Sequence, residues 1–190
     1  MLIKLIANQI NAPGTIADRL IGFDGHLAYR FTEDLQHFMK LTVGNTCVMG
    51  RETFESLPTR KSDGGKALSD RLNIILTRDN SYQAPEEGVL VAHSLSGGLQ
   101  AVAKNADYRF NDIYICGGQN VYEEAMLIAD RLVITDVDAK VSLDGAKNLR
   151  YFPEIDLNIW HEMPGTIYGV TKDGFDYRIS EYQRHITVPV

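Results

Sequence analysis

The sequence predicts an α/β protein with a mostly parallel central sheet, an antiparallel pair of strands at its C-terminal end and flanking helices. Up to residue 137, short apolar runs alternate with stretches of helical periodicity, which is the pattern of strands joined by crossover helices. Beyond residue 150, polar and apolar residues alternate instead, as in antiparallel strands with one solvated face. Because 190 residues suit one domain, we expect residues 1–190 to fold as a single unit.

The expected elements follow from these patterns in chain order. The nearly continuous apolar runs predict buried strands at Leu2–Ala7, Thr46–Met49, Leu72–Thr77, Val89–Ala92, Ile113–Cys116 and Leu132–Val137. Helical patterns are expected at Thr32–Thr42, where Thr32 could cap the helix, and at Val121–Ala129. The antiparallel pair is expected at Asn158–Met163 and Phe175–Tyr182. Gly, Asn, Asp and Lys residues predict surface loops at Asn8–Arg19, Thr59–Ala67 and Asp144–Arg150.

Charge and cysteine content limit the classes of partner. A formal charge of −6 and a pI near 5.3 predict no general attraction to nucleic acid or to an anionic membrane. The first apolar stretch contains Lys4 and is too short for a membrane span or a signal peptide. Cys47 and Cys116 stand in apolar runs without metal-ligand spacing. We therefore expect a cytoplasmic protein with free thiols, no disulfide and no metal site.

Two segments share a strand, a glycine and a helix start, at residues 46–57 and 113–126. A helix N-terminus presents free N–H groups, and glycine lets a phosphate approach the backbone closely. Arg51 and Thr53 add a cation and a hydroxyl to the first segment, whereas Gly117 and Gly118 follow the strand in the second. Because the G-x-G-x-x-G and P-loop patterns are absent from the sequence, these junctions predict a nucleotide site of another kind.

Arg78 directly follows the predicted strand NIILT. Together with Arg51, it could bind a ribose 2′-phosphate, which would favour NADP over NAD. The alternative is an arginine that is simply solvated.

Asp34 lies on the same face of the predicted helix 32–42 as Phe38 and Leu41. A carboxylate in apolar surroundings is partly desolvated, so its pKa rises unless a ligand with N–H donors pairs with it. An amino-heterocycle offers two such donors. The alternative is a solvent-facing carboxylate that stabilises the first helical turn.

Five segments together resemble the dihydrofolate reductase family in order and spacing. They are Leu20–Phe38, Val48–Pro58, Asn73–Arg78, Ile115–Ala125 and Leu132–Ala139, and Phe152–Pro153 also fits the family pattern. The resemblance implies a dihydrofolate-reductase-like single domain, and we expect it to be a monomer. It implies hydride transfer from NADPH to C6 of 7,8-dihydrofolate, which yields the tetrahydrofolate used in one-carbon and thymidylate metabolism.

The resemblance also implies roles for residues near the substrate. Asp34 would bind N3 and the 2-amino group of the pterin, and Thr135 would hydrogen-bond to that carboxylate. Tyr29 stands where the family has a tryptophan, and we expect its hydroxyl to join these two residues in the catalytic group. Arg71 would bind the glutamate carboxylate of the substrate. The substrate-binding set is completed by Ala7, Leu35, Phe38, Leu57, Cys116 and Tyr122.

For the cofactor, the resemblance implies that the backbone of Asn8 and Ile21 binds the nicotinamide carboxamide. It implies that Gly22–Leu27 is a mobile loop and that Gly117–Gly118 contains a cis peptide. The implied NADPH-binding set is Asn8, Ile21, Gly22, Gly50, Arg51, Glu52, Thr53, Thr77, Arg78, Gly117, Gly118, Gln119, Asn120, Val121 and Tyr122.

The sequence departs from the family at two places. Ala28–Tyr29 replaces a Pro-Trp pair, and Glu52 places a negative charge beside the cofactor phosphates. We expect slower turnover as a result, and a Tyr29→Trp variant that is faster.

Two other functions share the expected fold. One is a pyrimidine reductase of riboflavin synthesis, against which Asp34 argues. The other is a non-catalytic nucleotide-binding or structural relative, which NADPH-dependent turnover would distinguish from an enzyme.

Overall fold

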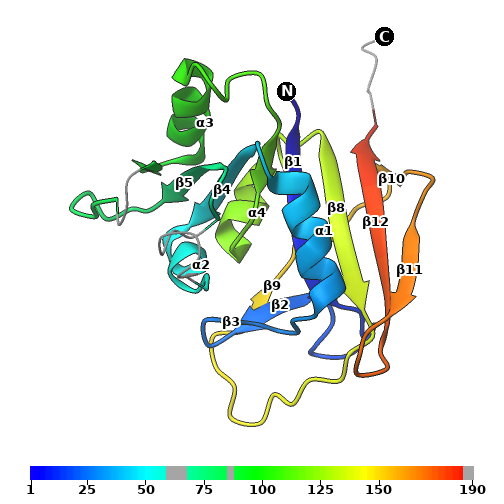
Figure 1. The fold of residues 1–190 in the computed structure, drawn as a ribbon. Helices are drawn as coiled ribbons and strands as arrows, with labels where there is room; N and C mark the ends of the chain where they lie inside the picture. The colour runs from blue at the N-terminus through cyan, green and yellow to red at the C-terminus, as the bar shows by residue number, and fades with distance from the viewer. Residues whose placement is uncertain (59–67, 85–87, 186–190) are drawn as a thin grey trace.

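The computed structural model describes residues 1–58, 68–84 and 88–185, and a nine-stranded sheet runs through it (Figure 1). The loop predicted at Thr59–Ala67 lies outside the described residues. The strand order is β10-β12-β8-β1-β7-β4-β5-β6, and β11 also pairs with β12. These strands are β1 (Ile3–Ile10), β4 (Thr46–Gly50), β5 (Leu72–Leu76), β6 (Val89–Ala92), β7 (Ile113–Ile115), β8 (Arg131–Val137), β10 (Trp160–Glu162), β11 (Ile167–Val170) and β12 (Asp176–Arg184).

The pairing confirms the predicted mixture of parallel and antiparallel strands. From β8 to β6 each neighbouring pair is parallel, whereas β12 runs antiparallel to β8, β10 and β11. The sequence analysis did not predict β11, and the GVTKDG segment turns from β11 into β12. The sequence of β11, IYGV, lacks the alternation of polar and apolar residues that would have indicated a strand.

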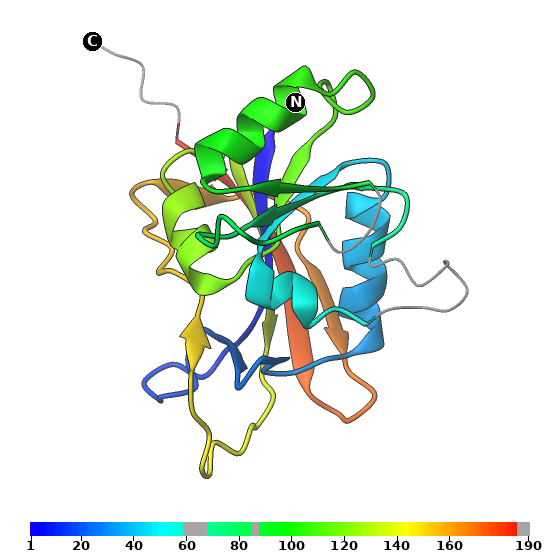
Figure 2. The same ribbon diagram turned by 90° about the vertical axis from the view of Figure 1, so that its left-hand side faces the viewer.

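Helices cover both faces of the sheet (Figures 1 and 2). They are α1 (Thr32–Thr42), α2 (Arg51–Glu55), α3 (Leu95–Lys104) and α4 (Gln119–Ala125). Phe38 of α1 packs on Ile6 and Val133, whereas Tyr122 of α4 joins a cluster with Leu5 and Leu132 from the other face. Each strand therefore contributes alternate residues to two cores.

Several boundaries differ from the predicted ones. α1 is capped by Phe31, not by Thr32, and no side chain caps it. α4 ends at Ala125, four residues before the predicted end. α3 was not predicted, although Ser94 accepts a hydrogen bond from the Gly97 N–H and caps it. Two glycines in its first turns weakened the helical pattern.

A small three-stranded sheet closes one end of the molecule (Figure 1). It contains β2 (Leu20–Phe23), β3 (His26–Leu27) and β9 (Arg150–Tyr151). The segment Gly22–Leu27 is thus a strand pair with a turn at Asp24–Gly25, where both residues have positive φ. Two predicted loops are shorter than expected, because Asn8–Ile10 pair with β8 and Arg150 belongs to β9.

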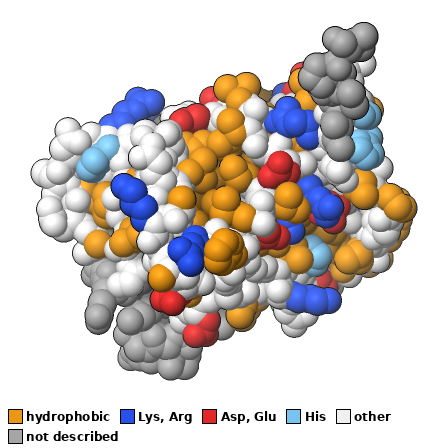
Figure 3. Space-filling view, turned by 90° about the horizontal axis from the view of Figure 1, so that it is seen from above, with side chains coloured by type: hydrophobic (Ala, Val, Ile, Leu, Met, Phe, Trp, Pro, Cys, Tyr) orange, Lys and Arg blue, Asp and Glu red, His pale blue; other side chains and the backbone are white. Residues whose placement is uncertain are grey.

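Charged side chains of both signs share the surface. On the face drawn in Figure 3, Lys and Arg side chains lie beside Asp and Glu side chains. Across the described ranges, no helix has the length and apolar character needed to cross a bilayer.

Candidate functional site

A cavity of about 480 Å³ opens between α1, α2 and the carboxyl ends of β1 and β7. Many of the predicted site residues line it. They are Ala7, Asn8, Asp34, Leu35, Phe38, Thr53, Leu57, Arg71, Cys116 and Tyr122. The fold therefore brings together residues from β1, α1, α2 and α4 and from the segments next to α2, β5 and β7.

Asp34 is the acidic residue among those that line this cavity in the described chain. The Asn8 side-chain amide donates a hydrogen bond of 3.0 Å to its Oδ2 atom. Desolvation raises the pKa of Asp34, and the hydrogen bonds from Thr135 and Asn8 lower it in part. The raised pKa means that desolvation outweighs these donors, as expected for a carboxylate on an apolar helix face.

β1 and β8 position both donors. Asn8 and Thr135 are direct neighbours in the parallel pair, so their side chains leave the same face of the sheet toward α1. Thr135 is buried behind the carboxylate and does not itself line the cavity. The sequence analysis expected the backbone of Asn8 to contact the cofactor, and its side-chain amide is a further part of the site.

Arg71 lies beside Thr42, at the C-terminal end of α1, and is held at two of its nitrogens. Its Nε donates 2.8 Å to the Thr42 hydroxyl, and its Nη1 donates to the Ser69 carbonyl. Its Nη2 is buried without a hydrogen-bond partner among the described residues. A buried donor without a partner is costly, and a carboxylate in the cavity would satisfy it.

Apolar side chains form the walls between Asp34 and Arg71. Leu35 and Phe38 come from α1, and Leu57 follows α2. Gly25, His26 and Leu27, from the predicted mobile loop, also line the cavity. The lining residues that were not predicted from the sequence are Ile6, Arg30, Met39, Met49, Ser56, Pro58, Leu68 and Ser69. Met49 could have been found, because it precedes the first strand–glycine junction.

Cys116 and Tyr122 line the cavity, but the thiol of Cys116 and the hydroxyl of Tyr122 interact with other protein groups. A hydrogen bond with Cys47 and burial raise the pKa of the Cys116 thiol well above its usual value, so it stays protonated. The Tyr122 hydroxyl donates 2.7 Å to the Ile6 carbonyl. Neither group is available for acid–base chemistry, and both shape the wall.

The two strand–glycine–helix junctions lie side by side. The Gly50 N–H donates 2.7 Å to the Gly117 carbonyl, and the Gly117–Gly118 peptide is cis, as the resemblance implies. A Cβ added at Gly118 would lie 3.3 Å from the Thr53 hydroxyl. No side chain caps either helix that starts here, so both helix starts leave backbone N–H groups open to a phosphate.

The predicted phosphate cations have different surroundings. Arg51 bonds Glu55 at 2.7 Å and Asp79 at 3.2 Å and lies over the Tyr82 ring. Arg78 is exposed at the end of β5 beside Thr77. Both cations are thus on the surface near the junctions.

Glu52 has a neighbour that the sequence analysis missed. Its carboxylate is 87% exposed and lies 3.8 Å from the guanidinium of Arg150 in β9. A nearby positive charge offsets repulsion of the cofactor phosphates by Glu52.

The remaining predicted cofactor residues lie around the same region. The Ile21 carbonyl accepts from the Ala28 N–H at 3.0 Å. A Cβ at Gly22 would meet the His26 carbonyl oxygen at 2.4 Å, so only glycine fits this strand pair. In α4, the Gln119 side chain accepts from the Tyr151 N–H, Val121 packs beside Gly50, and Asn120 is exposed.

Tyr29 is directed away from the cavity, contrary to its expected place in the catalytic group. Its hydroxyl donates 2.7 Å to the Asp173 carboxylate, and its ring packs edge-on against Phe175. The turn between β11 and β12 supplies both contacts. The Tyr29 side chain is not among the described residues that line the cavity. The structure therefore gives no reason to expect faster turnover in Tyr29→Trp.

We expect Tyr29→Phe to change kcat less than about twofold and to lower the free energy of unfolding by at most about 1 kcal/mol, the value of one exposed hydrogen bond. Steady-state kinetics and urea unfolding measure the two effects. A loss of kcat of tenfold or more at unchanged stability would return Tyr29 to the catalytic group.

Comparison with known proteins gives the same family as the motifs. The family model for dihydrofolate reductase matches residues 10–184. The chain belongs to the dihydrofolate reductase family. A dihydrofolate reductase from Staphylococcus aureus strain Mu50 is 34% identical over 151 residues, or 80% of each chain. A type 3 dihydrofolate reductase from Salmonella typhimurium is 35% identical over 163 residues, covering 86% of this chain and 85% of the relative.

A solved structure extends the similarity to the fold. The dihydrofolate reductase from Enterococcus faecalis complexed with NADP(H) and RAB-propyl matches with a TM-score of 0.73 and 30% identity. The match covers 97% of this chain and 96% of that one. The predicted dihydrofolate-reductase-like fold is therefore confirmed.

Proposed function

We propose that this protein is an NADPH-dependent oxidoreductase that reduces 7,8-dihydrofolate to 5,6,7,8-tetrahydrofolate. One observation carries the proposal most: a half-buried carboxylate with a raised pKa, Asp34, lines an apolar cavity beside two glycine junctions. Family membership and the relatives named dihydrofolate reductase support the same reaction.

Asp34 binds the pterin in this proposal. Its carboxylate accepts hydrogen bonds from the 2-amino group and N3, while Asn8 and Thr135 hold it in place. It favours the substrate form protonated at N5 without touching N5, and the proton arrives through water. Phe38, Leu35 and Leu57 exclude other water from the ring, and Arg71 Nη2 binds the glutamate carboxylate.

The residues at the junctions fit NADPH. A phosphate can approach the backbone at Gly50 and Gly118, where a Cβ would fill the space next to Val121 and Thr53. Arg51 and Arg78 provide positive charge for the 2′-phosphate. When bound, NADPH supplies the hydride for C6. The other predicted cofactor residues surround the same junctions and are proposed contacts.

We also propose that residues 1–190 form one domain and act as a monomer in the cytoplasm, within one-carbon metabolism. Cys47 and Cys116 are both free thiols, which supports a reducing compartment. The charge of −6 supports a function without nucleic acid or membrane partners.

The absorbance of NADPH tests the proposal. With purified protein, we expect oxidation that depends on dihydrofolate and that is slower with NADH. The matched control omits dihydrofolate. Binding of NADPH without any oxidation would instead favour a non-catalytic relative, the alternative that the fold alone permits.

Asn8→Ala should shift the pH profile of kcat/KM for dihydrofolate to higher pH. The Asn8 amide stabilises the charged carboxylate, so its loss raises the pKa of Asp34 further. Asn11→Ala is the matched control, because Asn11 donates to a different carboxylate, Asp138, at 2.7 Å. A profile that stays in place, or moves to lower pH, would contradict this role of Asn8.

A further inference from the structure

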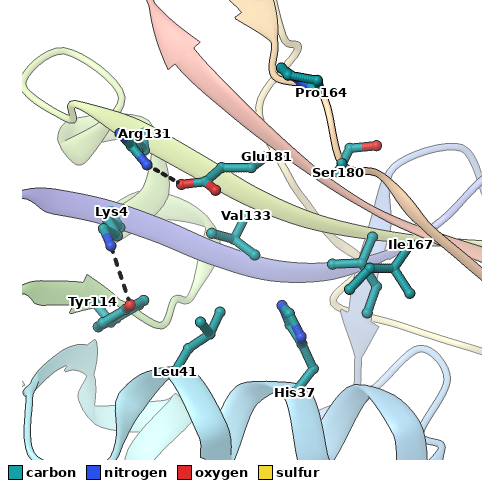
Figure 4. A pocket seen from close by; sticks show the side chains of 12 residues that line it. Lys4, His37, Leu41, Tyr114, Arg131, Val133, Pro164, Ile167, Ser180 and Glu181 are labelled. Carbon is teal, nitrogen blue, oxygen red and sulfur yellow. Dashed lines mark hydrogen bonds and ion pairs between the residues drawn. The ribbon is translucent and has the colours of Figure 1, made fainter.

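A second cavity, of about 220 Å³, lies between α1 and the strands β1, β8, β11 and β12 (Figure 4). Among the described residues, none lines both this cavity and the larger one. Along β1, Lys4 faces the small cavity and residues 6–8 face the large one. On α1, His37 belongs to the small cavity and Asp34, one turn earlier, to the large one. The proposed reduction of dihydrofolate does not use this space.

Two cations line the small cavity. The Lys4 Nζ atom lies 2.8 Å from the Asp112 carboxylate and 3.5 Å from the Tyr114 hydroxyl. The Arg131 Nη1 atom lies 2.8 Å from Glu181, the one carboxylate among the lining residues of the described chain. A guanidinium has five N–H donors, so Arg131 keeps donors for a ligand while it is paired with Glu181.

Neutral donors add to these cations. Burial lowers the pKa of His37 and raises the pKa of Tyr114, although Asp34 and Glu181 oppose the shift of His37 and Lys40 reinforces it. Both side chains are therefore uncharged near neutral pH and can donate a hydrogen bond without adding charge.

The opposite wall is apolar. Leu41 from α1, Val133 from β8, Ile167 from β11 and Ile179 from β12 line it. Figure 4 shows Leu41 and His37 rising from the helix toward the strands, with Lys4 and Arg131 at one end and Ile167 at the other. The cavity thus has a cationic end and an apolar end.

We propose that this cavity is a second ligand site, which takes a small carboxylate with an apolar body. The carboxylate lies against Lys4 and Arg131, and the apolar body covers Val133 and Ile167. Two cations and, among the described residues, one carboxylate line the cavity. Asp112 offsets part of the charge of Lys4, so an anion is favoured over an amine chiefly by the N–H donors that Arg131 keeps beside Glu181. The mixture of a few polar groups and apolar walls is that of small-molecule sites.

Isothermal titration calorimetry with phenylacetate tests the site directly. We expect one phenylacetate per chain. Acetate, which lacks the apolar body, and 2-phenylethylamine, which carries the opposite charge, should bind much more weakly. Binding of the amine in preference to phenylacetate would overturn the proposal, and so would an absence of phenylacetate binding.

Variants locate the bound carboxylate. Arg131→Gln and Lys4→Met should each weaken phenylacetate binding about tenfold, as expected when one charged hydrogen bond is lost. Glu181→Gln should tighten binding, because it removes the like charge. Lys104→Gln, at an exposed position of α3, is the matched control and should not change phenylacetate binding.

Two further variants keep the test decisive. Arg71→Gln removes the cation of the larger cavity that has a buried donor without a partner among the described residues. If Arg71→Gln loses phenylacetate binding and Arg131→Gln does not, the carboxylate binds in the larger cavity and the proposal is overturned. The double variant Arg131→Gln/Glu181→Gln removes the ion pair without changing the net charge. It replaces Arg131→Gln in the binding test if that single variant does not fold. Wild-type affinity in the folded double variant would also overturn the proposal. None of these measurements depends on reductase activity.

Discussion

Asp34→Asn should lower kcat/KM for dihydrofolate at pH 7 by about 100- to 1,000-fold, the usual cost of removing one group that stabilises charge in a transition state. The amide of the variant has the size of the carboxylate but carries no negative charge. It cannot pair with both N–H donors of the pterin, and it does not favour protonation of the substrate. Steady-state kinetics with NADPH and dihydrofolate measures the loss.

Glu33→Gln is the matched control, because it makes the same charge change one residue earlier in α1. NADPH affinity should be unchanged in both variants, since Asp34 lies on the pterin side.

The stability of the variant is a separate expectation. Because the pKa of Asp34 is raised in the folded protein, ionisation of Asp34 lowers the free energy of unfolding as pH rises through that pKa. Asp34→Asn should therefore not lower the free energy of unfolding at pH 7. Near-normal turnover in the folded variant would show that another residue is the essential acid.

Arg71→Gln should raise KM for dihydrofolate about 100-fold, which corresponds to about 2–3 kcal/mol for a charged hydrogen bond. The buried Nη2 atom has no partner among the described residues, so its hydrogen bond with the glutamate carboxylate is gained in full on binding. We expect kcat to change much less, because this contact is far from the reacting ring.

Arg30→Gln provides the comparison, since Arg30 is another arginine of the same cavity. It should affect KM far less than Arg71→Gln does. A dihydropterin without the glutamate tail should react with Arg71→Gln and wild type at similar rates. Because Arg71 also binds Thr42, thermal unfolding checks the variant. A KM that rises equally for both substrates would contradict carboxylate binding by Arg71.

Much of the fold could be predicted because its strands are long apolar runs. β4, β5, β7 and β8 lie within about one or two residues of the predicted ranges. β10 lies within the predicted strand Asn158–Met163, whereas β9 and β11 were not predicted, because they are short and depend on pairing with other segments. A two-residue strand such as Arg150–Tyr151 has no periodicity of its own, so the small sheet could not be predicted from local pattern.

Site residues could be predicted where the geometry of one helix sets their position. They could not be predicted where contacts with segments distant in the chain set the direction of a side chain. The spacing of Asp34 and Phe38 placed both on the face that now lines the cavity. The direction of Tyr29 depends on Asp173, which is 144 residues away in the chain. The bond from Asn8 to Asp34 depends on the register of β1 against β8. Neither contact has a local sequence pattern.

Isotope transfer tests the central claim most directly. The protein is incubated with dihydrofolate and NADPH that carries deuterium at the transferable C4 position. We predict tetrahydrofolate with deuterium at C6, formed by the wild-type protein and at a greatly reduced rate by Asp34→Asn. Oxidation of NADPH without deuterium at C6 of a folate product would contradict the account.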